Sequence, residues 1–391
     1  MLRQPLILPL LALAACTTEP ASEDCTGRHC GGGGDADTDT DTDTSGIRVP
    51  AEWEPQAAVW MQWPRSYERA DEPDFGRMVA ALLRFEDVHI LVHDARTRDS
   101  AEASLADDGG LASSVIGGGA SREGFKITWH DIPNDNAWMR DNGPLYVVRD
   151  GEVRIQDWGF DAWGGAFGRD VTYRSDDVVP DAVGEYLDMP VDKVDLVHER
   201  GNFEFNGVDT AVLNWTVLGD EKRNAGLTRA DAEATLKAKL GVSRVVMVEG
   251  APSDDLTGGH IDGIARFIDA DRIVVADCSA ASACQPGDAD DQIFDAAADT
   301  LEAAGLTVIR WPFASKVRYE GVDMSTDYMN WLVVNGGVLV NGYEDAAADA
   351  AAKAKLEGWF PGREVVVIPM LQSWFDGGGA HCHTNDQPAG G

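Results

Sequence analysis

The sequence predicts a mixed α/β fold with antiparallel strand pairs, carried by one large domain over residues 47–391. Short runs rich in β-branched and aromatic residues are interleaved with segments of helical periodicity. Glycine joins neighbouring strand runs at 148–153 and 335–338, which indicates hairpins. The regular strand-helix alternation of a doubly wound parallel sheet is missing, so the pattern alone predicts this class and no finer architecture.

The first residues predict export. Arg3 precedes an apolar run, Pro5–Ala15, that is too short to span a bilayer but suits the core of a signal peptide. The residues Leu-Ala-Ala-Cys that end at Cys16 resemble a bacterial lipobox, in which this cysteine becomes the lipid-carrying first residue. We expect residues 1–15 to be removed and the protein to be held at the cell envelope, on the outer membrane or periplasmic face, by this lipid alone. An uncleaved anchor or a plain secretory signal is the alternative.

Residues 16–46 predict a disordered tether. They are polar and rich in glycine, and the alternating Asp-Thr run at 35–44 offers nothing apolar to bury. Such aspartates could collect calcium, but the turn glycine and the terminal glutamate of a calcium loop are missing. The tether therefore predicts a linker and no metal site.

Residues 47–391 predict a globular catalytic domain, in a chain with a strongly acidic surface. The whole chain is 44% hydrophobic and 25% charged, with 12 tryptophans and a formal net charge of -35. Nucleic acid is excluded as a partner because its binding needs basic patches, whereas a small cationic substrate would be attracted. We expect no organic cofactor and no metal.

The elements follow from local signals along this domain. Helices are expected at 74–83, 228–240, 293–304 and 345–356, the second opened by Thr228 as N-cap and closed by Gly241. Strands are expected at 58–62, 88–92, 126–130, 145–149, 153–157, 211–215, 244–247, 263–267, 272–276, 307–309, 329–334, 337–339 and 365–368.

One of the six cysteines has no structural role that its position predicts. The other five are assigned to the lipid and to two local disulfides, namely Cys16, Cys25–Cys30 and Cys278–Cys284. Cys382 is left without a partner. An odd thiol in an exported protein is explained by a catalytic nucleophile.

The segment 134–144 contains the first candidate site residues. Asp141 could accept two hydrogen bonds from a guanidinium fork, while Trp138 covers the flat face of the cation. The alternative is an ordinary loop in which Asp and Asn cap backbone groups.

The segment 254–267 contains the second group. His260 and Asp262 are two residues apart on a segment expected to be extended, which would point both side chains to the same face. A metal-binding or merely solvated histidine is the alternative, since His-x-Asp alone is weak evidence.

The third group surrounds Cys382. The glycines at 377–379 remove β-carbons that would keep a ligand away from the backbone, and they place the cysteine on a tight turn. At an ordinary pKa only about 3% of a thiol is ionised at neutral pH, so the substrate cation or His260 must help. A zinc site made of His381, Cys382 and His383 is disfavoured by the spacing and by the lack of a second thiolate.

Together, five segments resemble the agmatine deiminase and bacterial peptidylarginine deiminase family. They are VPAEWEPQAAVWMQWP at 49–64, WMRDNGP at 138–144, WGFDAWGG at 158–165, GHIDG at 259–263 and GGGAHCHT at 377–384. Their order is the one expected, and they cover about residues 50–388. The resemblance implies a pentein fold, a five-bladed β/α propeller of ββαβ pseudo-repeats around a central active site.

The resemblance also implies a mechanism. Asp141 and Asp262 would grip a guanidinium group and Cys382 would attack its central carbon. His260 would hand a proton to the leaving ammonia and then activate water against an S-alkylthiouronium intermediate. The substrate-binding residues implied with these four are Trp138, Trp163, Asn330 and Gly379.

Two substrates stay open within this family. Phe160–Gly165 resembles the agmatine version, and no arginine pair for a carboxylate is seen there, which favours agmatine, the product being N-carbamoylputrescine as in putrescine synthesis. Glu199-Arg-Gly-Asn202 departs from the expected Glu-Gly-Gly, and Arg200 could repel an amine or bind a carboxylate. Peptidylarginine or free arginine, giving citrulline, is therefore the alternative.

Two other classes of protein are weighed against a deiminase. A non-catalytic guanidinium-binding lipoprotein would keep the pocket without turnover, but all four core residues are present. A cysteine protease using Cys382 and His260 is disfavoured, because two converging carboxylates do nothing for a neutral peptide bond.

Overall fold

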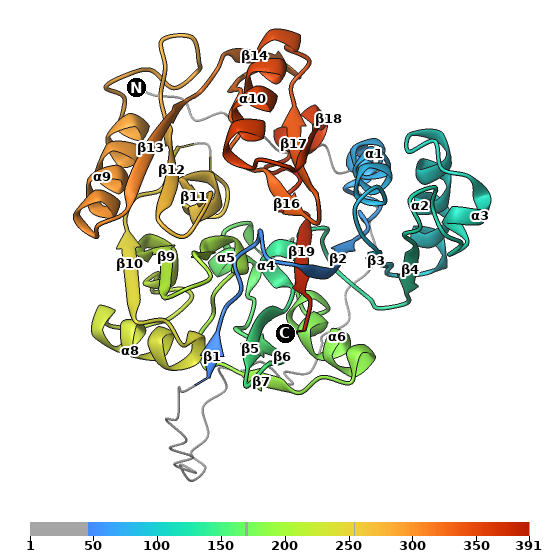
Figure 1. Cartoon of the computed structure of the whole chain (residues 1–391), viewed down its shortest axis with the longest axis horizontal. Helices are drawn as coiled ribbons and strands as arrows, with labels where there is room; N and C mark the ends of the chain where they lie inside the picture. The colour runs from blue at the N-terminus through green and yellow to red at the C-terminus, as the bar shows by residue number, and fades with distance from the viewer. Residues whose placement is uncertain (1–45, 169–170, 254, 391) are drawn as a thin grey trace, which may run out of the picture. The chain divides into compact units, whose positions relative to one another are not determined.

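Five small sheets built on the same strand order make up most of the computed structural model, which describes residues 46–168, 171–253 and 255–390 (Figure 1). The predicted signal peptide, Cys16, the pair Cys25–Cys30 and all but the last residue of the tether lie outside these ranges. Within them, no helix is long and apolar enough to cross a membrane.

The repeated unit is an antiparallel strand pair followed by a helix and a parallel third strand. In one unit, β11 (Ala265–Phe267) pairs antiparallel with β12 (Arg272–Asp277), and α9 (Ala289–Ala303) leads to β13 (Thr307–Pro312), parallel to β12. Three more units follow the same order. One consists of β5 (Leu145–Arg149), β6 (Glu152–Asp157), α6 (Val179–Leu187) and β7 (Val191–Lys193). The next consists of β8 (Glu204–Phe205), β9 (Thr210–Asn214), α8 (Arg229–Leu240) and β10 (Arg244–Val248), and the last of β16 (Leu332–Val334), β17 (Gly337–Gly342), α10 (Ala346–Trp359) and β18 (Glu364–Pro369). The predicted ββαβ repeat is confirmed.

The fifth unit is completed by strands from opposite ends of the domain. The last strand, β19 (Thr384–Pro388), pairs antiparallel with β2 (Gln56–Gln62), and α1 (Glu72–Leu82) then leads to β3 (Val88–Leu91), parallel to β2. A further strand, β4 (Ile127–His130), extends this sheet. The pairing of β19 with β2 closes the ring of five units seen in Figure 1.

Local sequence signals explain the helix boundaries. Helix α8 begins after Thr228, whose side chain accepts a hydrogen bond from the backbone N–H of Asp231. It ends at Gly241, whose φ of 69° is left-handed and favours glycine. A β-carbon at Gly241 would also overlap the carbonyl of Ile47, so this glycine lets the helix end pack against the start of the domain. Both predicted caps are confirmed.

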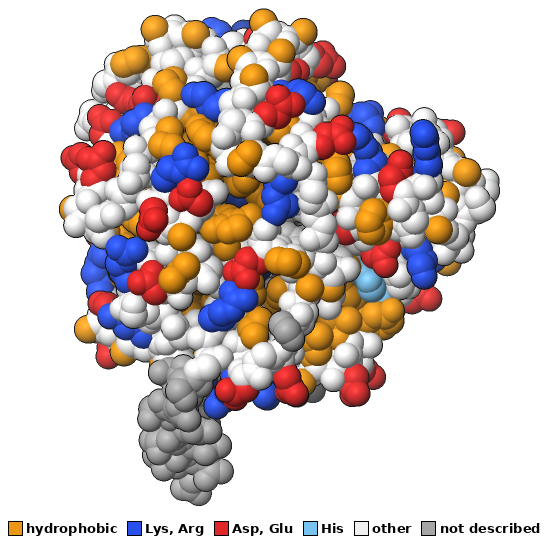
Figure 2. Space-filling view, viewed as in Figure 1, with side chains coloured by type: hydrophobic (Ala, Val, Ile, Leu, Met, Phe, Trp, Pro, Cys, Tyr) orange, Lys and Arg blue, Asp and Glu red, His pale blue; other side chains and the backbone are white. Residues whose placement is uncertain are grey.

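Apolar side chains from the helices and the strands form the core. The largest buried clusters lie between the helices and the sheets that they cover, with Phe294 and Leu301 of α9 packed against the strands. The expected disulfide between Cys278 and Cys284 is present. On the face shown in Figure 2, acidic and basic side chains are interspersed.

Candidate active site

Each of the five repeated units contributes a polar side chain from the segment that precedes its first strand. These side chains are Asp141 before β5, Glu199 before β8, Asp262 before β11, Asn330 before β16 and Cys382 before β19. The contacts below show that they meet in one site. The ring therefore brings together residues that the sequence separates by more than 200 positions.

The thiol of Cys382 lies against an amide and a carboxylate. Asn330 Nδ2 donates to Cys382 Sγ at 3.1 Å, and Asp262 Oδ2 lies 3.6 Å from the same sulfur. Cys382 is the one free cysteine in the part of the chain that the structure describes. Burial, and then the carboxylates of Asp262 and Asp141, raise the pKa of this thiol well above its usual range. Without a ligand the sulfur is therefore a neutral thiol.

Asn330 fixes the turn that carries the nucleophile. Its Oδ1 accepts the backbone N–H groups of Gly379, His381 and Cys382 at 3.0, 3.2 and 3.2 Å. A β-carbon at Gly378 would lie 2.9 Å from Cys382 Sγ, so a side chain there would crowd the sulfur. Gly378 therefore lets Trp138 and Cys382 pack close to the backbone, while the approach of a ligand at the glycine run stays a prediction.

His260 is buried between two carboxylates. Its Nδ1 lies 3.4 Å from Asp141 Oδ1 and its Nε2 lies 3.7 Å from Glu199 Oε2. Burial lowers the pKa of His260, but Asp141 and Glu199 raise it more, to about 9. The imidazole is therefore protonated at neutral pH and can act as a proton donor.

The geometry of His260 and Asp262 differs from the prediction. The residues from Ile261 to Gly263 form a 3-10 turn, η5, and not an extended strand, so the argument that both side chains share a strand face was wrong. The reason is local: Asp255 Oδ1 accepts the backbone N–H groups of Thr257 and Gly259, which starts a turn just before His260. Both side chains still reach the site.

Asp141 has one carboxylate oxygen that accepts no hydrogen bond from the described residues, although His260 Nδ1 lies 3.4 Å from it. Oδ2 accepts a hydrogen bond from Trp163 Nε1 at 2.8 Å, whereas Oδ1 is buried and has no hydrogen-bond partner among the described residues. Burial raises the pKa of Asp141 to about 7, with His260 lowering it and Asp262 raising it. A buried acceptor without a donor is costly unless a ligand supplies one.

Glu199 is a site residue that the sequence did not predict. It is fully buried, and Arg223 Nε donates to its Oε1 at 2.8 Å. Burial raises the pKa of Glu199, but Arg223 and His260 lower this pKa by more than burial raises it, to about 2. Glu199 therefore faces His260 as an anion. The available signal was its place before a first strand, which it shares with the other four residues.

Arg200, the next residue, forms an ion pair inside the protein. Its Nη2 lies 2.7 Å from Asp386 Oδ1, which Arg140 also contacts at 2.7 Å. The guanidinium group of Arg200 is therefore already ion-paired inside the protein. That Arg200 repels an amine or binds a substrate carboxylate stays a prediction.

The four residues that the resemblance implies for substrate binding differ in how closely they contact the catalytic residues. Asn330 and Trp163 contact Cys382 and Asp141 as described. Trp138 stacks on His383 with ring centroids 4.3 Å apart, and its ring borders Gly378 at the nucleophile turn. Gly379 packs against Asn341 and donates to Asn330. Contact of these four residues with substrate stays a prediction.

Replacing Gly379 tests its structural part in the site. In Gly379→Ala the new β-carbon would overlap the side-chain amide of Asn341, which itself accepts the N–H of Ala380. We expect the free energy of unfolding to fall by about 1–3 kcal/mol, measured by urea denaturation. Gly358→Ala in α10 is the control, because nothing lies near its β-carbon and alanine favours a helix. Equal stability of both variants would contradict this packing.

The residues of the zinc alternative are engaged separately. His383 Nε2 lies 2.6 Å from Ser373 Oγ and its Nδ1 lies 2.8 Å from the Ala137 carbonyl. His381 lies between Asp262 and Glu52. The two imidazoles therefore do not converge with Cys382 on one ion.

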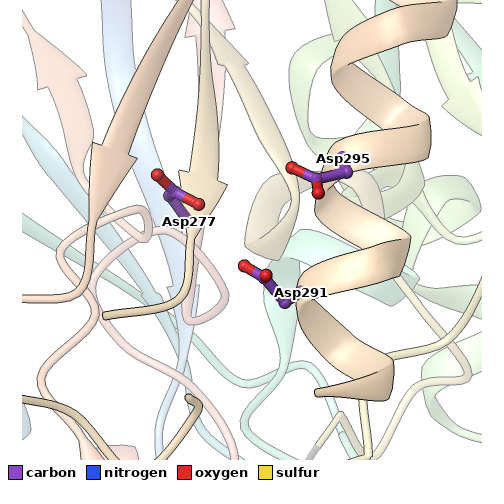
Figure 3. A group of neighbouring side chains, drawn as sticks. All are labelled: Asp277, Asp291 and Asp295. Carbon is purple, nitrogen blue, oxygen red and sulfur yellow. The ribbon is translucent and has the colours of Figure 1, made fainter. Parts of the chain in front are cut away.

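Three aspartates that could hold a cation lie elsewhere, on β12 and α9 (Figure 3). They are Asp277, Asp291 and Asp295. Arg310 donates to Asp277 and Asp295 at 2.7 Å each, so a guanidinium already offsets their charge.

Comparison with known proteins identifies the family. Residues 48–388 match the model of the Porphyromonas-type peptidyl-arginine deiminases. The agmatine deiminases of Pseudomonas aeruginosa (strain LESB58) and Pseudomonas putida are each 31% identical, over 380 and 385 residues, covering 88% of this chain and 96% of each relative. The structure of the Enterococcus faecalis agmatine deiminase matches with a TM-score of 0.72 at 25% identity, over 88% of this chain and 96% of that one. With the predicted pentein fold confirmed, the chain belongs to the Porphyromonas-type peptidyl-arginine deiminase family.

Proposed function

We propose that this protein is a hydrolase of carbon–nitrogen bonds in linear amidines, and that it converts agmatine to N-carbamoylputrescine and ammonia. The observation that supports this most is the meeting of a thiol, an imidazolium and two carboxylates in one buried site. Oδ1 of Asp141, which accepts no hydrogen bond in the described part of the chain, is an acceptor suited to a guanidinium N–H.

Substrate binding prepares the nucleophile. A guanidinium held between Asp141 and Asp262 donates hydrogen bonds to both, each worth about 1.5–3 kcal/mol net. Its positive charge offsets the two carboxylates that raise the pKa of Cys382, so the thiol loses its proton to solvent when the site is filled. The thiolate of Cys382 therefore forms only when the guanidinium carbon that it attacks is already in the site.

Two steps then follow at one carbon. Cys382 Sγ forms a bond to the guanidinium carbon, and His260 gives its proton to the departing nitrogen as the C–N bond breaks and ammonia leaves. The product of this step is a cationic S-alkylthiouronium. The neutral His260 next takes a proton from water, whose oxygen bonds to the same carbon. The C–S bond breaks as the remaining hydroxyl proton passes to solvent, the neutral ureido product leaves, and the thiolate of Cys382 is regenerated.

The two catalytic pKa values predict a bell-shaped pH profile. Asp141, with a pKa of about 7, loses its charge as the pH falls, so kcat/KM decreases below about pH 7. His260, with a pKa of about 9, loses its proton as the pH rises, so kcat/KM decreases above about pH 9. Glu199→Gln removes one anion that raises the pKa of His260 and moves the basic limb to lower pH. Ammonia release measured across this range checks both limbs, and an unmoved basic limb in Glu199→Gln would contradict the role given to His260.

Agmatine is supported over arginine by the charges around the site. Arg200 is paired with Asp386, and Arg223 with Glu199 and Asp220, so both guanidinium groups already have a carboxylate partner inside the protein. The names of the Pseudomonas and Enterococcus relatives point the same way. Trp163, from the segment that resembles the agmatine version, contacts Asp141.

Parallel incubations with agmatine, free arginine and an arginine-ended peptide test the proposal. We expect ammonia and ureido product from agmatine, with kcat/KM at least about tenfold above the other two. Citrulline as the main product would assign the protein to arginine or peptidylarginine, and binding without ammonia would assign it to the non-catalytic class. Cleaved peptide without citrulline would identify a protease.

We also propose that Cys16 carries a lipid that holds the protein at the cell envelope. The apolar run and lipobox-like residues before it support this. In Cys16→Ser we expect the protein to move from the membrane fraction to the soluble fraction of fractionated cells, checked by immunoblotting. Unchanged membrane association would contradict the anchor.

A further inference from the structure

The carboxylate of Asp262 is backed by a buried chain of polar groups that leads away from the nucleophile. His381 Nδ1 lies 2.8 Å from Asp262 Oδ2, and His381 Nε2 lies 3.0 Å from Glu52 Oε2. Arg266 Nη2 donates to the same Glu52 oxygen at 2.9 Å. His381 and Arg266 are each 1% exposed, whereas the side chain of Glu52 is 14% exposed, so the chain runs from the buried site toward the surface. None of these three residues was predicted to act in the reaction.

The same chain reaches the amide that holds the nucleophile. Arg266 Nη1 donates to the carbonyls of Met329 and Trp331 at 3.1 and 2.8 Å, which are the two neighbours of Asn330. Glu52 Oε1 accepts the backbone N–H of Val333 at 2.5 Å. One network therefore supports both Asp262 and the segment of Asn330.

A comparison of the two site aspartates shows what His381 adds. Both are buried, but an imidazole nitrogen lies 2.8 Å from Asp262, that of His381, whereas the His260 nitrogen beside Asp141 lies 3.4 Å away. The pKa of Asp141 is raised to about 7. Burial also raises the pKa of Asp262, yet the contact with His381 and neighbouring charges lower it below its usual value.

We infer that Glu52 and His381 are positioning residues: Glu52 orients the imidazole, and the imidazole orients Asp262 and keeps it as the carboxylate that binds the guanidinium. An imidazole held between two carboxylates has a fixed ring orientation, as in the supporting shells of other catalytic sites. The role of Asp262 in binding the guanidinium rests on the proposed function, whereas the contacts of His381 with Asp262 and Glu52 do not depend on it. The groups that face Asp262 and share in its titration are Asp141, His260, Arg266, His381 and Cys382.

Two isosteric substitutions separate the two halves of this chain. The amide nitrogen of asparagine occupies about the place of Nδ1, and that of glutamine about the place of Nε2. His381→Asn therefore keeps a donor toward Asp262 and loses the contact with Glu52. His381→Gln does the reverse. Glu52→Gln keeps the shape and removes the charge behind the ring, and His89→Gln, in a partly buried histidine pair outside the site, is the control.

Turnover and binding are both measured against pH. In His381→Gln we expect kcat/KM to fall about tenfold or more, because a hydrogen bond to a charged group is lost, and His381→Asn to retain most of the activity. Without its donor, Asp262 should titrate like Asp141, so the acid limb of His381→Gln steepens from about one proton to about two and moves to higher pH. Glu52→Gln should move it in the same direction by less, and His89→Gln should leave it in place.

Agmatine binding to the same variants in a Cys382→Ser background, followed by calorimetry, gives the same readout without turnover. We expect the same shift of the acid limb in His381→Gln. The inference would be overturned if kcat/KM fell equally in His381→Asn and His381→Gln and the acid limb of the pH profile did not move. The network would then have a purely structural role. If the protein with Cys382 intact binds agmatine but releases no ammonia, while the shift is present, the proposed function is wrong and the inference stands. Absence of agmatine binding in the Cys382→Ser parent would overturn both.

Discussion

Cys382→Ser is expected to lower turnover by about a thousandfold or more, to the limit of detection. A hydroxyl ionises far less readily than a thiol and is a much weaker nucleophile toward a guanidinium carbon, even with the cation beside it. The fold should persist, because the turn is held by backbone groups bound to Asn330 and not by the sulfur. Ammonia release and a thermal melt measure the two effects separately.

The matched control is the double variant Cys278→Ser/Cys284→Ser, which removes the other described cysteines. That disulfide closes a loop after β12, outside the site, so turnover should remain. Retained activity in Cys382→Ser would contradict the covalent step. A trapped adduct of the substrate on Cys382, found by mass spectrometry, would support it directly.

Asp141→Asn has the second largest expected effect, a fall in kcat/KM of about 10²- to 10⁴-fold. The range follows from the loss of the charge in two hydrogen bonds, one from the guanidinium to Oδ1 and one from Trp163 to Oδ2, each worth about 1.5–3 kcal/mol. An amide also presents a donor where the guanidinium needs acceptors. Because Asp141 raises the pKa of His260, the same variant should move the basic limb of the pH profile to lower pH.

Asp291→Asn, in the acidic group beside Arg310, is the control for losing one negative charge. It lies outside the site and should leave kcat/KM unchanged. If Asp141→Asn retained the activity of this control, the guanidinium would not be held by Asp141. Agmatine binding measured in a Cys382→Ser background would then have to locate another acceptor.

The sequence predicted the four core residues because each lies in a short motif with unusual chemistry. Asp141, His260, Asp262 and Cys382 all reach the site. Glu199 was not predicted as a site residue because its segment was considered only for the choice of substrate. The burial of Glu199 beside Arg223 also depends on long-range packing, which no local pattern shows. Single motifs report which groups are present, whereas partners from other strands decide their charge.

The elements of the fold were predictable in part, and its closure was not: α6 and the strands β7, β8 and β19 were not among the expected elements. Caps such as Thr228 and Gly241 are local signals, so α8 could be predicted from the sequence. The helix α2 (Ala95–Asp107) was missed because it buries only three residues, Ala101, Ser104 and Leu105, which leaves a weak apolar pattern. The pairing of β19 with β2 joins residues more than 300 positions apart, for which no local pattern exists.

That closing pair has a consequence for when the enzyme becomes competent. The nucleophile precedes the final strand of the ring, and that strand is held by β2, near the start of the domain. A partly synthesised or partly folded chain therefore has binding carboxylates but no reactive sulfur in place. The reactive sulfur therefore takes its place only when strands from the two ends of the ring have paired.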